Sequence, residues 1–100
     1  MKTVNEDMME FIHGQLIRRM NDPRYIIKST DTLESLFGRG KQDVKEFINA
    51  FNRKIVRYPK LANNKLRYSK NLTYGKVLTK FIENYEQIKI HESKGSSYSE

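Results

Sequence analysis

The side chains of this chain that are best suited to bind a ligand are those of Lys and Arg. Residues 47–82 contain nine Lys and Arg and no Asp or Glu, whereas the other ten Lys and Arg share the rest of the chain with all twelve Asp and Glu. The formal net charge of +7 therefore comes from this one stretch. Because like charges repel one another in a compact protein, such a stretch is typical of a surface that binds a polyanion, most commonly nucleic acid. The nine cations are Arg53, Lys54, Arg57, Lys60, Lys65, Arg67, Lys70, Lys76 and Lys80.

Polar side chains that could contact DNA bases precede this stretch and overlap it. Lys can pair with guanine in the major groove, and Gln or Asn can pair with adenine. Arg39 lies beside Gly38 and Gly40, where a cation and free backbone amides could bind a phosphate. A solvated helix face and simple turn geometry remain the alternative explanations. The predicted DNA-binding residues are Arg39, Lys41, Gln42, Lys45, Asn49, Asn52, Arg53, Arg57, Lys60, Lys65, Arg67 and Lys70.

Residues for catalysis or metal binding do not form a recognisable set. The chain has no Cys, and its two His, His13 and His91, have no spacing typical of a metal site. The acidic cluster Glu6, Asp7 and Glu10 is explained by its place at a predicted helix start. We therefore expect a protein that is not an enzyme and needs no cofactor or metal.

The elements that would hold the cations in place begin with a helix. Thr3 and Glu6 have the spacing of a capping box, and apolar residues recur every three or four positions from Val4 to Met20. Asn21-Asp22-Pro23 should end this helix, because Pro removes a hydrogen-bond donor and disfavours helical backbone in the residue before it.

A short strand and two helices are predicted next. Arg24–Lys28 is β-branched and aromatic, which favours a strand. Asp31 resembles an N-cap for a short helix that ends at Gly38-Arg39-Gly40. The most regular helical pattern follows, with apolar residues at Val44, Phe47, Ile48, Phe51 and Ile55.

The C-terminal part is predicted to contain a hairpin and a last helix. Tyr58–Lys70 alternates roughly between apolar and polar residues around Asn63-Asn64, which suits a β-hairpin. Helical spacing returns from Tyr74 to Ile88, with Thr73 as the cap. Residues 92–100 lack an apolar period and are expected to be a disordered tail.

The segment from Asp31 to Phe47 resembles a helix-turn-helix, because a turn Gly at position 38 is followed by apolar anchors at Val44 and Phe47. The order α-β-α-α-β-β-α over residues 4 to about 90 is similar to that of small winged helix-turn-helix proteins of bacteria and mobile elements, such as excisionases and phage repressors. The resemblance implies a mostly α fold with a small β-hairpin, in one domain over residues 1–91. It also implies that Lys41–Val56 is the recognition helix and Tyr58–Lys70 the wing.

These features predict sequence-specific binding of double-stranded DNA by a small regulator, excisionase or replication factor. Specific binding by so small a domain would be helped by homodimerisation through the first or last helix. One alternative is a phage-type interaction module that inhibits a nucleic-acid-binding host protein. Another is RNA binding through stacking on Tyr58 and Tyr68. The polar, acidic first residues are unlike a signal peptide, so we expect a cytoplasmic protein with no membrane partner.

Overall fold

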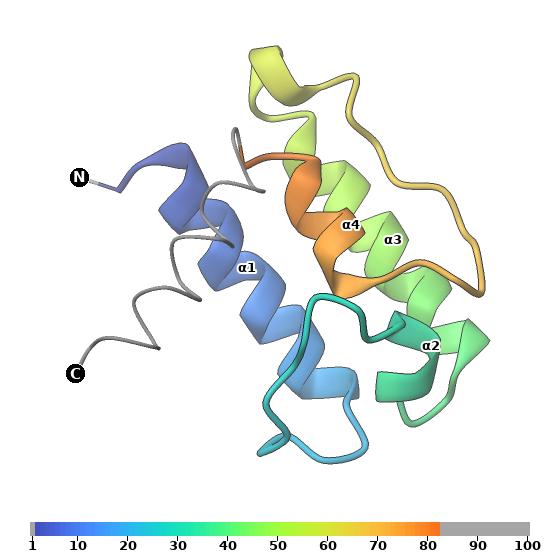
Figure 1. The fold of residues 1–100 in the computed structure, drawn as a ribbon. Helices are drawn as coiled ribbons and strands as arrows, with labels where there is room; N and C mark the ends of the chain where they lie inside the picture. Colours follow the sequence, from blue (N-terminus) through green and yellow to red (C-terminus); the bar gives the residue numbers. More distant parts are fainter. Residues whose placement is uncertain (1, 83–100) are drawn as a thin grey trace, which may run out of the picture.

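Two long helices packed against each other form the centre of the structure, which a computed structural model describes for residues 2–82. They are α1 (Val4–Arg19) and α3 (Lys41–Ile55). Three shorter elements accompany them: α2 (Leu33–Leu36), the 3-10 helix η1 (Pro59–Leu61) and α4 (Tyr74–Thr79). Figure 1 shows α2 near the start of α3, and a long extended segment that runs beside α3 before the chain enters α4. No helix within residues 2–82 is both long enough and apolar enough to cross a lipid bilayer.

The helix starts follow from their cap residues. At α1 the Thr3 hydroxyl accepts the Glu6 backbone N–H, and the Glu6 carboxylate accepts the Thr3 N–H, so the predicted capping box is confirmed. Thr73 caps α4 as predicted, through the Lys76 N–H. The cap of α2 is Thr32 and not Asp31, because the Thr32 hydroxyl accepts the Ser35 N–H.

One face of α3 forms the centre of the core. The ring centroid of Phe47 lies 6.0 Å from that of Phe37 and 6.3 Å from that of Phe51. Burying one side chain of this kind contributes roughly 1.5–3 kcal/mol. Apolar packing against α1 and α2 therefore holds α3 in place and leaves its opposite face to solvent. The buried apolar residues of α3 are those that the periodicity predicts: Val44, Phe47, Ile48, Phe51 and Ile55.

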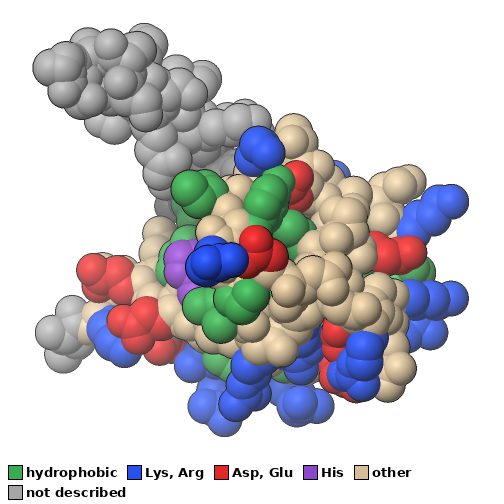
Figure 2. All heavy atoms as spheres, turned by 90° about the horizontal axis from the view of Figure 1, so that it is seen from below, with side chains coloured by type: hydrophobic (Ala, Val, Ile, Leu, Met, Phe, Trp, Pro, Cys, Tyr) green, Lys and Arg blue, Asp and Glu red, His purple; other side chains and the backbone are tan. Residues whose placement is uncertain are grey.

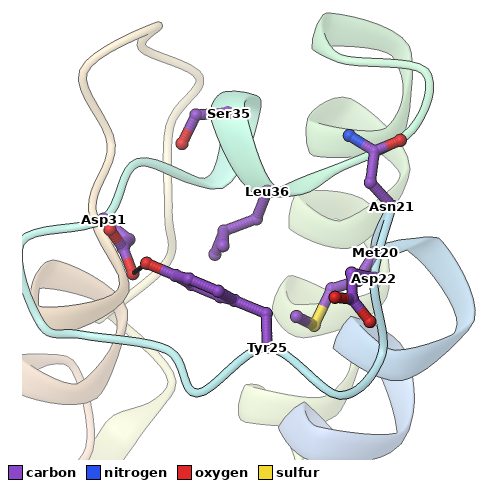
Figure 3. Close-up of a pocket in the computed structure, with 7 residues that line it drawn as sticks. All are labelled: Met20, Asn21, Asp22, Tyr25, Asp31, Ser35 and Leu36. Carbon is purple, nitrogen blue, oxygen red and sulfur yellow. Dashed lines mark hydrogen bonds between the residues drawn. The ribbon is translucent and has the colours of Figure 1, made fainter.

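The predicted strand at Arg24–Lys28 is wrong. This segment belongs to the connection between α1 and α2, and its backbone is held by local turns in place of a partner strand. The Asp22 carboxylate accepts the Arg24 N–H, and the Asp31 carboxylate accepts the Lys28 N–H. Figure 3 shows the Tyr25 ring across a hollow of about 250 Å³, with its hydroxyl directed at Asp31. Asp carboxylates that satisfy nearby amides favour turns over strands.

The predicted β-hairpin at Tyr58–Lys70 is also wrong, and with it the winged helix-turn-helix fold. Within residues 2–82 there is no strand, only two isolated bridges, Met20 with Phe37 and Thr32 with Thr73. Pro59 begins η1, where its missing N–H costs nothing. Residues 64–69 are extended, but they lie against α3 and no second strand accompanies them.

The last predicted helix is only partly described. α4 covers Tyr74–Thr79 and ends in a turn at Lys80 and Phe81, so it stops earlier than the predicted pattern from Tyr74 to Ile88. Residues 83–88 and the predicted tail at residues 92–100 lie outside the described residues. Val77, Leu78 and Phe81 are buried and join α4 to the core.

Candidate nucleic-acid interface

The exposed face of α3 brings together most of the predicted base-contacting residues. Gln42, Lys45 and Asn49 are exposed and follow one another at helical spacing, so they lie on one face. Lys41 and Arg53 are exposed at the two ends of the same face. Among residues 2–82, Gln42, Asn49 and Arg53 have no side-chain hydrogen bond or ion pair. This face therefore carries amide and cationic groups that are free to meet a ligand.

Asn52 lies at the edge of that face and has a different role. Its amide oxygen accepts the Leu66 N–H at 2.8 Å, and its amide nitrogen donates to the Leu66 carbonyl at 3.1 Å. The side chain thus gives the extended segment the pair of hydrogen bonds that a neighbouring strand would supply. Asn52 therefore fixes the segment to α3, and its amide group is directed at the Leu66 backbone.

A Tyr–Lys cluster fixes the same segment near the start of α3. The Tyr68 hydroxyl donates to the Glu34 carboxylate at 2.6 Å, and this hydrogen bond raises the pKa of Tyr68. The ammonium groups of Lys41 and Lys45 lie 5.3 and 5.8 Å from the centroid of the Tyr68 ring. The Tyr68 hydroxyl is hydrogen-bonded to Glu34, and two ammonium groups lie over the face of the ring. The ring is therefore not free for a base to stack on it.

The extended segment points alternate side chains inward and outward. Leu66 is buried and Tyr68 is half-buried, whereas Lys65 and Arg67 are exposed, as is Lys70 in the turn that follows. The segment is antiparallel to α3, since Leu66 meets Asn52 and Tyr68 meets Lys41 and Lys45. Three predicted cations, Lys65, Arg67 and Lys70, therefore border the exposed face of α3.

The start of α3 is occupied by the protein's own carboxylates. Asp43 is only 3 % exposed; it accepts the Arg39 backbone N–H at 2.9 Å and pairs with the Arg39 guanidinium at 2.6 Å. Burial raises the pKa of Asp43, but the hydrogen bonds from Arg39 outweigh burial, so the net pKa lies below its ordinary value. Arg39 also pairs with Glu46 at 2.8 Å. The place where a phosphate was predicted to bind, beside Arg39 and Gly40, is filled by Asp43. Arg39 is therefore not a free cation.

The remaining predicted residues lie toward the end of α3. Arg57 follows the helix and is exposed. Lys60, in η1, is also exposed, and it lines a different hollow from Lys65 and Arg67, one shared with Val4 and Ile82.

Ion pairing divides the charged residues sharply. Each of the eight carboxylates in residues 2–82 accepts a hydrogen bond or pairs with a cation. Of the nine cations in residues 47–82, only Lys54 has an ion pair with a described residue, at 2.9 Å from Asp7. The hydroxyl of Tyr58 donates to the same Asp7 carboxylate. The other eight cations form no ion pair within residues 2–82.

A different kind of surface lies beside α1. Ile17 and Ile26 are 55 % and 84 % exposed, and Ile17 lines a hollow together with His13 and Tyr25. Figure 2 shows this face, where apolar side chains form a group and many Lys and Arg side chains lie along the edges of the molecule. Within residues 2–82, no three His, Asp or Glu side chains lie close enough to hold a metal ion. The predicted homodimer through the first or last helix stays a prediction.

Two cations that were not among the predicted DNA-binding residues also lie near the extended segment. Lys76 and Lys80 belong to the acid-free stretch, which was the available signal, but their predicted helix gave no reason to group them with Lys65 and Arg67.

Comparison with known proteins adds no relative: no family model matches the chain, and neither the curated proteins nor the solved structures contain a match.

Proposed function

We propose that the protein binds double-stranded DNA with sequence preference, with the exposed face of α3 in the major groove. The observation that carries this proposal is the set Gln42, Lys45 and Asn49, exposed on one helix face and bordered by unpaired cations. A helix of this size fits the major groove, where amide and ammonium groups distinguish base pairs. Lys65, Arg67 and Lys70 would contact phosphates and fix the register of the helix on the duplex.

Three changes to the expected contact set follow from internal bonding. Arg39 and Asn52 are occupied within the protein, so the proposal does not use them. Lys60 lines a different hollow from Lys65 and Arg67, so the proposal treats it as a peripheral phosphate contact. The proposal depends on the charge distribution and on α3, and it does not need a wing.

Duplex DNA is favoured over single-stranded nucleic acid. Recognition of a single strand commonly uses aromatic rings on which bases stack. The hydroxyls of both candidate rings, Tyr58 and Tyr68, are bonded to carboxylates, and ammonium groups lie near both ring faces. A biological role as a small regulator, excisionase-like protein or replication factor would suit such a duplex-binding activity.

Selection of bound sequences from random duplexes at moderate salt tests the proposal. We expect enrichment of a short motif by the wild-type chain. Lys45→Glu with Asn49→Ala should remove or change that motif, because these side chains face the bases in the proposed complex. Arg18→Gln on α1 is a matched control that should leave the motif unchanged, since Arg18 is exposed on the other long helix.

Weak binding without any motif, unaltered by the α3 variant, would contradict the proposal. That result would favour an acidic protein as the ligand of the basic surface. Tighter binding to single-stranded than to duplex oligonucleotides would likewise contradict it, in favour of RNA or single-stranded DNA.

A further inference from the structure

A cationic hollow lies between the extended segment and α4. It has a volume of about 400 Å³ and is lined by four cations, Lys65 and Arg67 from the segment and Lys76 and Lys80 from α4 and its end. Among residues 2–82, no carboxylate lines it. The buried side chains of Leu66 and Leu72 form apolar parts of its wall. Because charges above a low-dielectric wall produce a stronger field than charges on an open surface, this hollow attracts anions.

The cations are arranged for an extended anion. Lys65, Arg67 and Lys76 are exposed and Lys80 is half-buried, so they surround an open hollow and do not enclose a single small ion. The hollow also has polar groups: the Ser69 hydroxyl accepts the Asn71 N–H and keeps its own hydrogen to donate. Such a set of donors matches phosphate oxygens that follow one another along a chain.

The lining contains no aromatic side chain, which distinguishes the hollow from a base-binding site. Sites that hold unpaired bases use aromatic stacking, whereas duplex backbones present only phosphates and sugars. The segment that carries Lys65 and Arg67 is also the border of the exposed face of α3. A DNA backbone that passes over this segment from α3 would reach Lys76 and Lys80 next.

We propose that the hollow between residues 65–73 and α4 binds backbone phosphates of the DNA that α3 contacts. This inference rests on the proposed function, to which it adds Lys76 and Lys80 as phosphate-binding residues. The two regions then have separate roles: the face of α3 determines which sequence is bound, and the hollow adds affinity for every sequence.

The test compares Lys76→Gln/Lys80→Gln with a control that removes the same charge from residues 2–46, Arg18→Gln/Lys28→Gln. Binding to the selected duplex and to a scrambled duplex is measured by fluorescence anisotropy over a range of salt. Removal of two phosphate contacts should make the slope of log K against log salt shallower by roughly 1.8. Affinity for the two duplexes should fall equally. For each lost contact, the loss of affinity at 0.1 M salt should be about eightfold larger than the loss at 1 M salt. The control should keep the wild-type slope.

Three results would overturn the inference in distinguishable ways. If the hollow variant keeps the wild-type slope while Lys45→Glu/Asn49→Ala changes the preference, the hollow is not a phosphate site, although the proposed function stands. If the wild-type chain binds no duplex, the proposed function fails and the inference with it. If tripolyphosphate shifts the amide resonances of residues 65–80 and DNA neither shifts them nor competes, the hollow binds free polyphosphate and not DNA.

Discussion

Residues 2–46 and residues 47–82 use their charges in different ways. The first region has eight cations and eight carboxylates, and each of these carboxylates accepts a hydrogen bond or forms an ion pair. The second region has nine cations and no carboxylate, and only Lys54 pairs with a described residue. Most carboxylates of the first region therefore stabilise local structure there. The second region is held by apolar burial, by the Asn52 hydrogen bonds and by the contacts of Lys54 and Tyr68 with Asp7 and Glu34 of the first region. The difference teaches that the fold of residues 2–82 uses no ion pair from eight of these nine cations, and these eight are the cations that the proposed function assigns to a ligand.

The largest effect on the free energy of unfolding is expected for a substitution in the apolar core, and it would test whether packing holds the second region. Phe47→Ala removes a fully buried ring at the start of the second region and should lower the free energy of unfolding by about 3–5 kcal/mol. Chemical denaturation at low and high salt measures it. A loss that depended strongly on salt would show that charges, and not packing, hold this region.

The next effect concerns the ion pair at the start of α3. Asp43→Asn should cost about 1.5–3 kcal/mol at neutral pH, because it weakens charged hydrogen bonds to Arg39 at a buried position. The pKa of Asp43 is lower in the folded than in the unfolded chain, so its contribution is present above about pH 4 and is lost as pH falls through the folded-state value. Denaturation of both chains from pH 7 to pH 2 checks this sign, since the difference between them should shrink only in acid.

A matched pair of Asn residues on α3 separates folding from recognition. Asn52→Ala should destabilise the protein by about 1–3 kcal/mol, because the Leu66 N–H and carbonyl lose their partners. Asn49→Ala, one turn earlier on the exposed face, should change stability by less than about 0.5 kcal/mol and act on DNA preference alone. Equal destabilisation by the two substitutions would contradict the separate roles of these residues.

The smallest effect is expected for the unpaired cations. Lys65→Gln or Arg67→Gln should change the free energy of unfolding by no more than about 0.5 kcal/mol, with a slight gain at low salt from reduced repulsion. Thermal melts at 20 mM and 200 mM salt would detect it. A clear loss of stability would mean that these side chains have structural partners.

Periodicity and caps were sufficient to predict the helices that pack on one another. The capping box of Thr3 and Glu6 and the apolar series from Val44 to Ile55 both depend on residues that are three or four positions apart. The acid-free stretch likewise predicted where unpaired cations lie. These patterns are local in the sequence, so the contacts that they predict do not depend on how distant segments pack.

What could not be predicted depends on three-dimensional geometry that residue spacing alone does not give. The alternation from Lys65 to Tyr68 does separate an inner from an outer side, but the partner of this segment is a helix side chain, Asn52, and not a strand. Asn52 looked like a base-contacting residue because it lies at the edge of the polar face of α3. Arg39 looked free because its pairing with Asp43 and Glu46 depends on how the turn at Gly40, with a φ of 52°, presents it to α3.

The salt dependence of duplex binding by the wild-type chain tests the central claim most directly. If five to seven of the unpaired cations contact phosphates, log K against log salt should fall with a slope of roughly −4.5 to −6.3. A slope near zero, or no measurable binding at low salt, would contradict the claim that this surface binds DNA.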